Sequence, residues 1–148
     1  LYVYWKRTFL HPALKAFDAP ERQECTAERA TSNTPLQALV LLNDPTFVES
    51  ARVFAQKVLA QSETGSGSRL DFAFRRAVGR IPSAREKEEL NKFLENQLER
   101  YRKEPATAKE LVAVGQAPLP AVLDSRELAA WTAVCRVVLN LHETITRS

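Results

Sequence analysis

The stretch Ser32–Pro45 restricts the fold of this chain more than any other, because it contains two helix starts in close succession. Thr34 precedes Pro35, and Gln37 follows three residues after Thr34. This is the pattern of a helix N-cap, a proline at the first helical position and a capping box. The second start is Asp44, which is also followed directly by a proline. The stretch therefore predicts a short helix and the beginning of a second one.

The segment between these two starts is almost entirely apolar, from Leu36 to Leu42. A helix that is apolar on all sides usually lies in a protein interior. We therefore predict that this short helix is buried on most of its surface and lies at the centre of the domain.

Helical spacing of apolar residues continues through the rest of the chain. Further helices are predicted after Asp44, from Arg69, after a capping box at Ser83–Glu86, and after Asp124. The sequence thus predicts a mainly α fold, a single helical-bundle-like domain of about five or six helices. The predicted core residues are Leu39, Phe47, Phe54, Phe74, Phe93, Leu98, Trp131 and Val138.

The N-terminal part differs from the rest. Residues 1–9 alternate aromatic and β-branched side chains, which favours an extended segment or an edge strand, and prolines make the stretch up to Pro20 irregular. The length of 148 residues suits one core, so residues 1–148 are interpreted as a single domain with a flexible loop near residues 63–68. The abrupt start on an aromatic run indicates a C-terminal fragment of a larger domain.

Composition excludes several classes of protein. Hydrophobic residues at 45% and charged residues at 26% are globular values, which exclude a disordered tail. The net charge of +3 is mild and acidic residues alternate with basic ones, so no nucleic-acid partner is expected. No apolar run approaches the roughly 20 residues of a membrane-spanning helix, so no membrane span is expected.

Cysteines and histidines give no metal or haem pattern. Cys25 and Cys135 are far apart and lack the spacing of a zinc or haem-attachment site, so we expect no metal and no cofactor in this chain. Two unpaired thiols are favoured over a disulfide, with Cys135 in the core. His11 and His142 could be ligands or a general base, but a capping role is favoured, with His142 in the final turn of the last helix.

Polar residues gather in the loops around the predicted central helix. As a functional site they could bind a sugar or supply paired carboxylates for glycoside hydrolysis. As structure they would cap helices and hold irregular backbone, which must find hydrogen-bond partners, and this interpretation is favoured. The candidate residues are Asp18, Glu21, Arg22, Cys25, Arg29, Asn33, Gln37, Asn43 and Asp44.

Four segments carry a resemblance to a known family: Phe17–Arg22, Cys25-Thr26, Thr34–Pro45 and Glu127–Thr132. On these residues the chain resembles the C-terminal domain of unknown function in planctomycete secreted proteins, which often carry a planctomycete-type cytochrome c domain upstream. The resemblance covers essentially the whole chain. It implies a further helical region before Tyr2, so that the chain corresponds to the C-terminal part of that domain.

The resemblance also implies a setting. The parent protein is expected to be exported to the periplasm or cell surface, to have several domains, and to carry haem, if at all, in an upstream domain. Expected partners are the upstream region of the same polypeptide, a cytochrome c domain or a polysaccharide. The resemblance supplies no catalytic residue, and the family commonly has Asp at the position of His142.

Three functional hypotheses follow. The leading one is a non-catalytic structural or interaction module of an exported multidomain protein associated with a cytochrome c domain. The alternative is a glycan-binding or glycan-processing domain that uses the polar loop of residues 18–33 and the N-terminal aromatic residues. A third is docking of a cytochrome partner through Arg75, Arg76 and Arg80.

Overall fold

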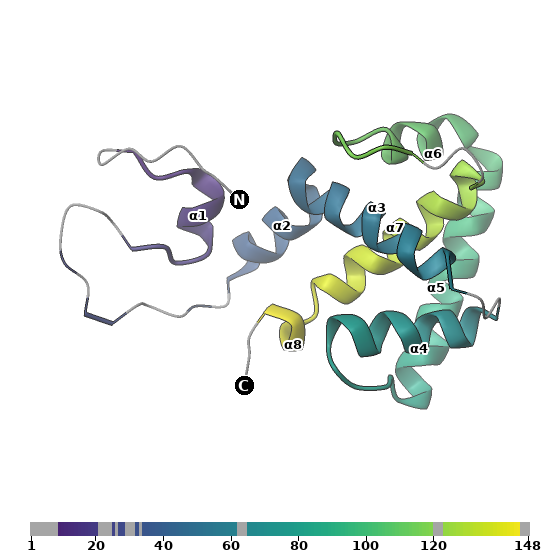
Figure 1. Cartoon of the computed structure of the whole chain (residues 1–148), viewed down its shortest axis with the longest axis horizontal. Coiled ribbons are helices and arrows are strands. Elements are labelled where there is room, and N and C mark those ends of the chain that lie inside the picture. Colours follow the sequence, from purple (N-terminus) through teal and green to yellow (C-terminus); the bar gives the residue numbers. More distant parts are fainter. Residues whose placement is uncertain are drawn as a thin grey trace. The chain divides into compact units, whose positions relative to one another are not determined.

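The structure is a computed structural model that describes residues 9–20, 25, 27–28, 32, 34–61, 65–119 and 123–145. Within these residues the chain forms eight helices and no strand, so the predicted all-α class is confirmed (Figure 1). The predicted extended segment at residues 1–9 lies, except for Phe9, outside the described residues. The helices are α1 (Pro12–Ala16), α2 (Pro35–Asn43), α3 (Pro45–Leu59), α4 (Ser66–Ala77), α5 (Ala84–Lys103), α6 (Pro105–Val112), α7 (Ser125–Leu139) and α8 (His142–Ile145).

The chain divides into two compact units, Leu1–Val40 and Leu41–Ser148. In the second unit α7 is the central helix and packs against α3, α5 and α6 (Figure 1). Every residue of α7 from Leu128 to Cys135 is buried, which explains its nearly continuous run of small and apolar side chains. The helices α3, α4, α5 and α6 each contribute buried residues to the same core, whereas α8 has no buried residue.

Side-chain caps begin the long helices where the sequence predicts them. Asp44 accepts a hydrogen bond from the Thr46 backbone N–H at 2.9 Å, and Asp124 accepts one from the Arg126 N–H at the same distance. Ser83 forms a complete capping box with Glu86 at the start of α5. These caps satisfy backbone donors that a helix cannot satisfy itself, so they fix where α3, α5 and α7 begin.

The observed core agrees only in part with the predicted one. Phe74, Trp131 and Val138 are buried, as is Cys135, and Phe54, Phe93 and Leu98 pack at the edge of the core. Phe47 is half-buried. The prediction that Leu39 is a core residue is wrong, because its side chain is 55% exposed.

Three element boundaries differ from the sequence-based expectation. Residues 12–16, expected to be irregular, form α1, with His11 as its N-cap. The helix α4 begins at Ser66, so residues 66–68 of the expected loop are helical. His142 is not in the final turn of the last long helix, since α7 ends at Leu139 and His142 begins α8.

None of the helices that the structure describes is long and apolar enough to cross a membrane.

Candidate functional site

The polar cluster of the first unit is built on Asp18, which has a left-handed backbone conformation with a φ of 55°. Its carboxylate accepts hydrogen bonds from the Ser32 backbone N–H at 2.7 Å and from the Ser32 hydroxyl at 2.7 Å. The Gln37 side-chain amide donates a further bond to it at 3.3 Å. These contacts join two residues that are fourteen positions apart in the sequence.

Gln37 connects Asp18 and Ser32 to α2. Its amide nitrogen also donates to the Ser32 hydroxyl at 3.2 Å, and its amide oxygen accepts from the Thr34 N–H at 3.1 Å. The Thr34 hydroxyl in turn accepts from the Gln37 N–H at 3.4 Å, which completes the predicted capping box. The Gln37 side chain is only 2% exposed, so these bonds satisfy an amide that would otherwise be costly to bury.

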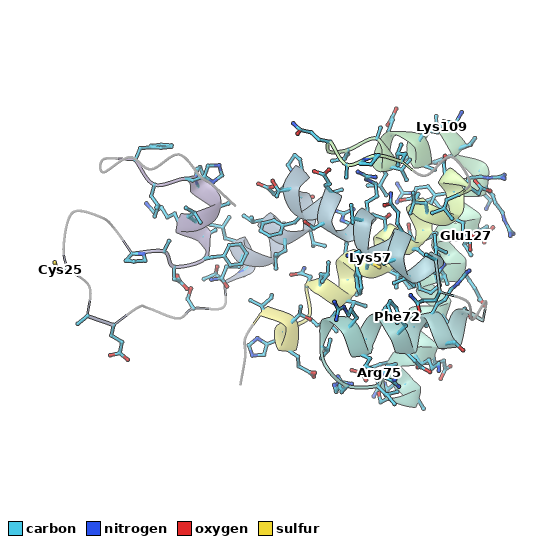
Figure 2. All side chains as sticks on the ribbon, in the orientation of Figure 1. Cys25, Lys57, Phe72, Arg75, Lys109 and Glu127 are labelled. Carbon is cyan, nitrogen blue, oxygen red and sulfur yellow. The ribbon has the colours of Figure 1, made fainter. Side chains whose placement is uncertain are left out.

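Among the candidate residues that the structure describes, it brings together Asp18 and Gln37. Cys25 is exposed and has a free thiol (Figure 2). Asn43 and Asp44 belong to the second unit, where Asp44 caps α3. The candidates Glu21, Arg22, Arg29 and Asn33 lie outside the described residues.

Ser32 is the member of the cluster that the candidate set omits. Its backbone N–H and its hydroxyl both donate hydrogen bonds to the Asp18 carboxylate. Serine next to a helix start commonly binds neighbouring backbone or side-chain groups, and this was the available signal. The oxygens of Asp18 are thus engaged by donors of the protein itself, and the cluster links Asp18 to Ser32 and anchors α2.

The helix α2 presents an apolar surface, contrary to the prediction that it is buried. Leu36 is 58% exposed and Leu39 is 55% exposed, and Gln37 is the only residue of the helix that is buried. Leu36 and Leu39 are three residues apart and so lie on the same face of the helix. The prediction failed because an apolar sequence favours burial of a helix but does not show which other part of the protein would cover it. We call Leu36 and Leu39 the α2 apolar face.

The second unit contains a polar cluster that the sequence did not indicate. Arg52 on α3 is 1% exposed, although the helical period places it on the polar side. It donates to the Ala117 carbonyl at 2.8 Å and lies 3.6 Å from the Glu49 carboxylate. Its Nε and Nη1 atoms have no hydrogen-bond partner among the described residues. Arg52 therefore anchors the segment after α6 on α3.

Glu49 completes this anchor. Its Oε1 atom accepts hydrogen bonds from the backbone N–H groups of Ala117 and Gln116, the latter at 2.7 Å. These backbone donors, with a smaller contribution from the charge of Arg52, lower the pKa of Glu49 below its usual value. Gly115 precedes them with a φ of +94°, and this conformation brings the backbone against the Glu49 side chain.

The structure shows the surroundings of His11 and of the two cysteines. His11 accepts a hydrogen bond from the Ala13 N–H at 3.3 Å through Nδ1, which confirms its capping role. Both cysteines are free, and burial raises the pKa of the Cys135 thiol well above its ordinary range. In the described part of the chain no three His, Cys, Asp or Glu residues are grouped to hold a metal ion.

Comparison with known proteins identifies one family. Its model, described as "Protein of unknown function (DUF1553)" and named PSD1, matches residues 1–94. The chain belongs to this family. No curated protein and no solved structure matches the chain. The matched region contains the Asp18–Ser32–Gln37 cluster, the α2 apolar face and Arg52.

Proposed function

We propose that this member of the family is a non-catalytic structural and interaction module, and that the α2 apolar face is its contact surface. The observation that carries the proposal is the exposure of Leu36 and Leu39 on a helix without a single charged residue. Full burial of a leucine side chain contributes roughly 1.5–3 kcal/mol, so covering two that are about half exposed would contribute roughly 2–3 kcal/mol. A partner that covers this face would gain this contribution toward the free energy of binding, and its remaining contacts would have to supply the rest.

The helix is held in place before any partner arrives. The Thr34–Gln37 capping box and the bonds to Asp18 fix its first turn. At its other end the Leu42 carbonyl accepts a hydrogen bond from the Arg136 guanidinium of α7. Because α2 needs no ordering on binding, less conformational entropy opposes the association.

The polar cluster supports the same function. Asp18 and Gln37, the two candidates that the structure brings together, use their side chains to bind Ser32 and to start α2. Truncating either would release the helix end, so their residue types are explained by the support that they give to α2. The polar cluster thus holds the first turn of α2, the helix that carries the α2 apolar face.

The partner that we propose is an uncharged, apolar helical segment from the upstream region of the same polypeptide. Two arguments support it. The α2 apolar face offers no charge to pair, so a charged partner surface would lose hydration without compensation. The resemblance to planctomycete secreted proteins implies a helical region before this chain. That resemblance also supports export of the parent protein and haem, where present, in a cytochrome c domain upstream of this one.

Photo-crosslinking in the longer polypeptide tests the contact. A photoreactive amino acid replaces Leu39, and the control carries it at Leu119, which is exposed to a similar extent at 48%. We expect mass spectrometry to find crosslinks from position 39 to the upstream region and none from position 119. Equal crosslinking from both positions, or none from position 39, would contradict the proposal.

The non-catalytic part has its own test. The isolated chain and its Asp18→Ala variant are incubated with a panel of polysaccharides, and reducing ends are counted. We expect no turnover by either protein. Turnover that the variant loses would show that the polar cluster is an active site, in favour of a glycan-processing domain.

A further inference from the structure

Arg80, in the turn between α4 and α5, is fully engaged within the second unit. Its guanidinium forms a salt bridge with Glu86 at 2.6 Å and another with Glu143 at 2.8 Å. It also lies over the Phe74 ring, 5.4 Å from the centroid. These contacts tie α4, α5 and α8 together, and they leave Arg80 without a donor for an external partner.

Three other arginines at the same turn have no ion-pair partner among the residues that the structure describes. Arg75 and Arg76 are in the last turn of α4, and Arg85 is in the first turn of α5. All three are exposed, and within the described ranges none has an ion pair or a side-chain hydrogen bond. We call these three residues the arginine patch.

The acids nearest in sequence are already paired. Asp71 accepts two hydrogen bonds from Lys87, both at 2.8 Å, and Glu86 binds Arg80. Glu88 and Glu89, one turn after Arg85 on α5, share Lys92, whose Nζ atom lies 2.8 Å from Glu88 and 3.8 Å from Glu89. The positive charge of the arginine patch is therefore not neutralised by these neighbours. Charges left uncompensated in this way attract oppositely charged partners from a distance.

Helix stability explains only part of the arrangement. Cations are favourable at a helix C-terminus, which accounts for Arg75 and Arg76. Arg85 is a cation in the first turn of α5, where the helix dipole disfavours positive charge. The turn between the two helices also exposes Ile81, an apolar side chain that is 56% accessible. Neither feature is explained by helix stability, and both side chains are exposed, so they are available to a partner.

We propose that the arginine patch and Ile81 form a docking surface for a protein partner that presents clustered Asp and Glu side chains around an apolar residue. Arginine binds carboxylates through two parallel hydrogen bonds, which gives such a contact its geometry. Ile81 favours a protein over a nucleic acid, because single-stranded nucleic acids are bound through aromatic stacking and duplexes mainly through phosphates. This surface is separate from the α2 apolar face and does not depend on the function proposed for it.

Fluorescence anisotropy of the whole chain tests the surface. The probe is a labelled glutamate-rich peptide with one central leucine, and the salt concentration is varied. The test variant is Arg75→Glu/Arg85→Glu. The control is Lys57→Glu/Lys109→Glu, which changes the net charge equally at exposed positions on α3 and α6, away from Arg75 (Figure 2).

We expect the peptide to bind at low salt and to be released as salt rises. The test variant should weaken binding by about tenfold or more, and the control by about twofold or less. Ile81→Ser should weaken binding of the leucine peptide but not that of a peptide with glycine in its place. Circular dichroism verifies folding, and Arg75→Gln/Arg85→Gln replaces the test variant if charge reversal unfolds the chain.

Several results would overturn the proposal. Absence of peptide binding would do so directly. An equal loss in the test and control variants would show attraction by net charge alone. Tighter binding of duplex DNA than of the peptide would assign the arginine patch to nucleic acid instead.

Discussion

Replacing Gly115 by alanine should destabilise the second unit more than any other glycine substitution in it. At Gly115 an added Cβ would lie 2.2 Å from the Glu49 Cδ atom, so the carboxylate has to move. The backbone N–H groups of Gln116 and Ala117 would then lose their acceptor. The positive φ of +94° adds a strain that an alanine Cβ does not tolerate well.

Gly79 offers a matched comparison. Its φ is +89°, nearly that of Gly115, but nothing lies within 4 Å of the added Cβ. Gly79→Ala therefore measures the backbone strain alone, which is about 1–2 kcal/mol. Gly115→Ala should cost about 1–2 kcal/mol more, because two backbone hydrogen bonds to Glu49 are lost. In a chain of this length each kcal/mol corresponds to a decrease in melting temperature of about 2–4 °C.

Urea and thermal unfolding followed by circular dichroism give the two differences in free energy of unfolding. A double variant sharpens the test, since Glu49→Ala removes the side chain with which the new Cβ collides. In that background Gly115→Ala should cost no more than Gly79→Ala does. Equal destabilisation by the two glycine substitutions in the wild-type background would refute the packing of Glu49 against Gly115.

Three further predictions concern pH, packing and thiol chemistry. Hydrogen bonds with Arg80 lower the pKa of Glu86 from 4.5 to about 2. The ionised Glu86 side chain therefore contributes about 1 kcal/mol to the free energy of unfolding, after screening at this partly exposed site. This contribution is present above pH 4.5 and is lost as the pH falls toward 2. The stability difference between wild type and Glu86→Gln should therefore shrink between pH 6 and pH 3 in urea melts, and a constant difference would argue against the ion pair. The Phe74 side chain is 1% exposed, so Phe74→Ala should lower the free energy of unfolding by about 3–5 kcal/mol, as measured by thermal unfolding. A loss below 1 kcal/mol would contradict the burial of Phe74. Ellman's reagent should titrate one thiol, Cys25, in the native chain and both after unfolding, because Cys135 is buried with a raised pKa.

Local signals in the sequence predicted the helices well. Asp44, Ser83 and Asp124 mark the starts of α3, α5 and α7, because an N-cap acts on backbone donors within a few residues of itself. Apolar spacing likewise placed Phe74 and Trp131 in the core. The short helix α1 escaped prediction, since five residues are too few to show a period.

Burial depends on contacts between distant parts of the chain, and there the sequence was less informative. An apolar α2 was expected to be buried, yet Leu36 and Leu39 are exposed. Arg52 lies on the polar side of α3 by its helical spacing, yet it is buried because the Ala117 carbonyl and Glu49 lie against it. Neither the exposure of α2 nor the burial of Arg52 can be predicted from the pattern of neighbouring residues.

The candidate site shows the same limit. Residue types singled out Asp18 and Gln37, and the structure joins them. Asp18 and Ser32, however, are fourteen residues apart in the sequence, and their hydrogen bond depends on how the backbone folds between them. The residue type of Ser32 alone was therefore not enough to select it over its neighbours.

Amide hydrogen exchange in α2 tests the central claim most directly. Exchange of peptides covering Leu36–Leu42 is compared between this chain and the longer polypeptide that includes the upstream region. If the α2 apolar face binds that region, exchange should slow by about tenfold or more in the longer polypeptide, because opening the helix then requires release of the partner. Unchanged exchange rates in α2 would show that the upstream region does not cover it, and would contradict the assignment of this helix as the contact surface.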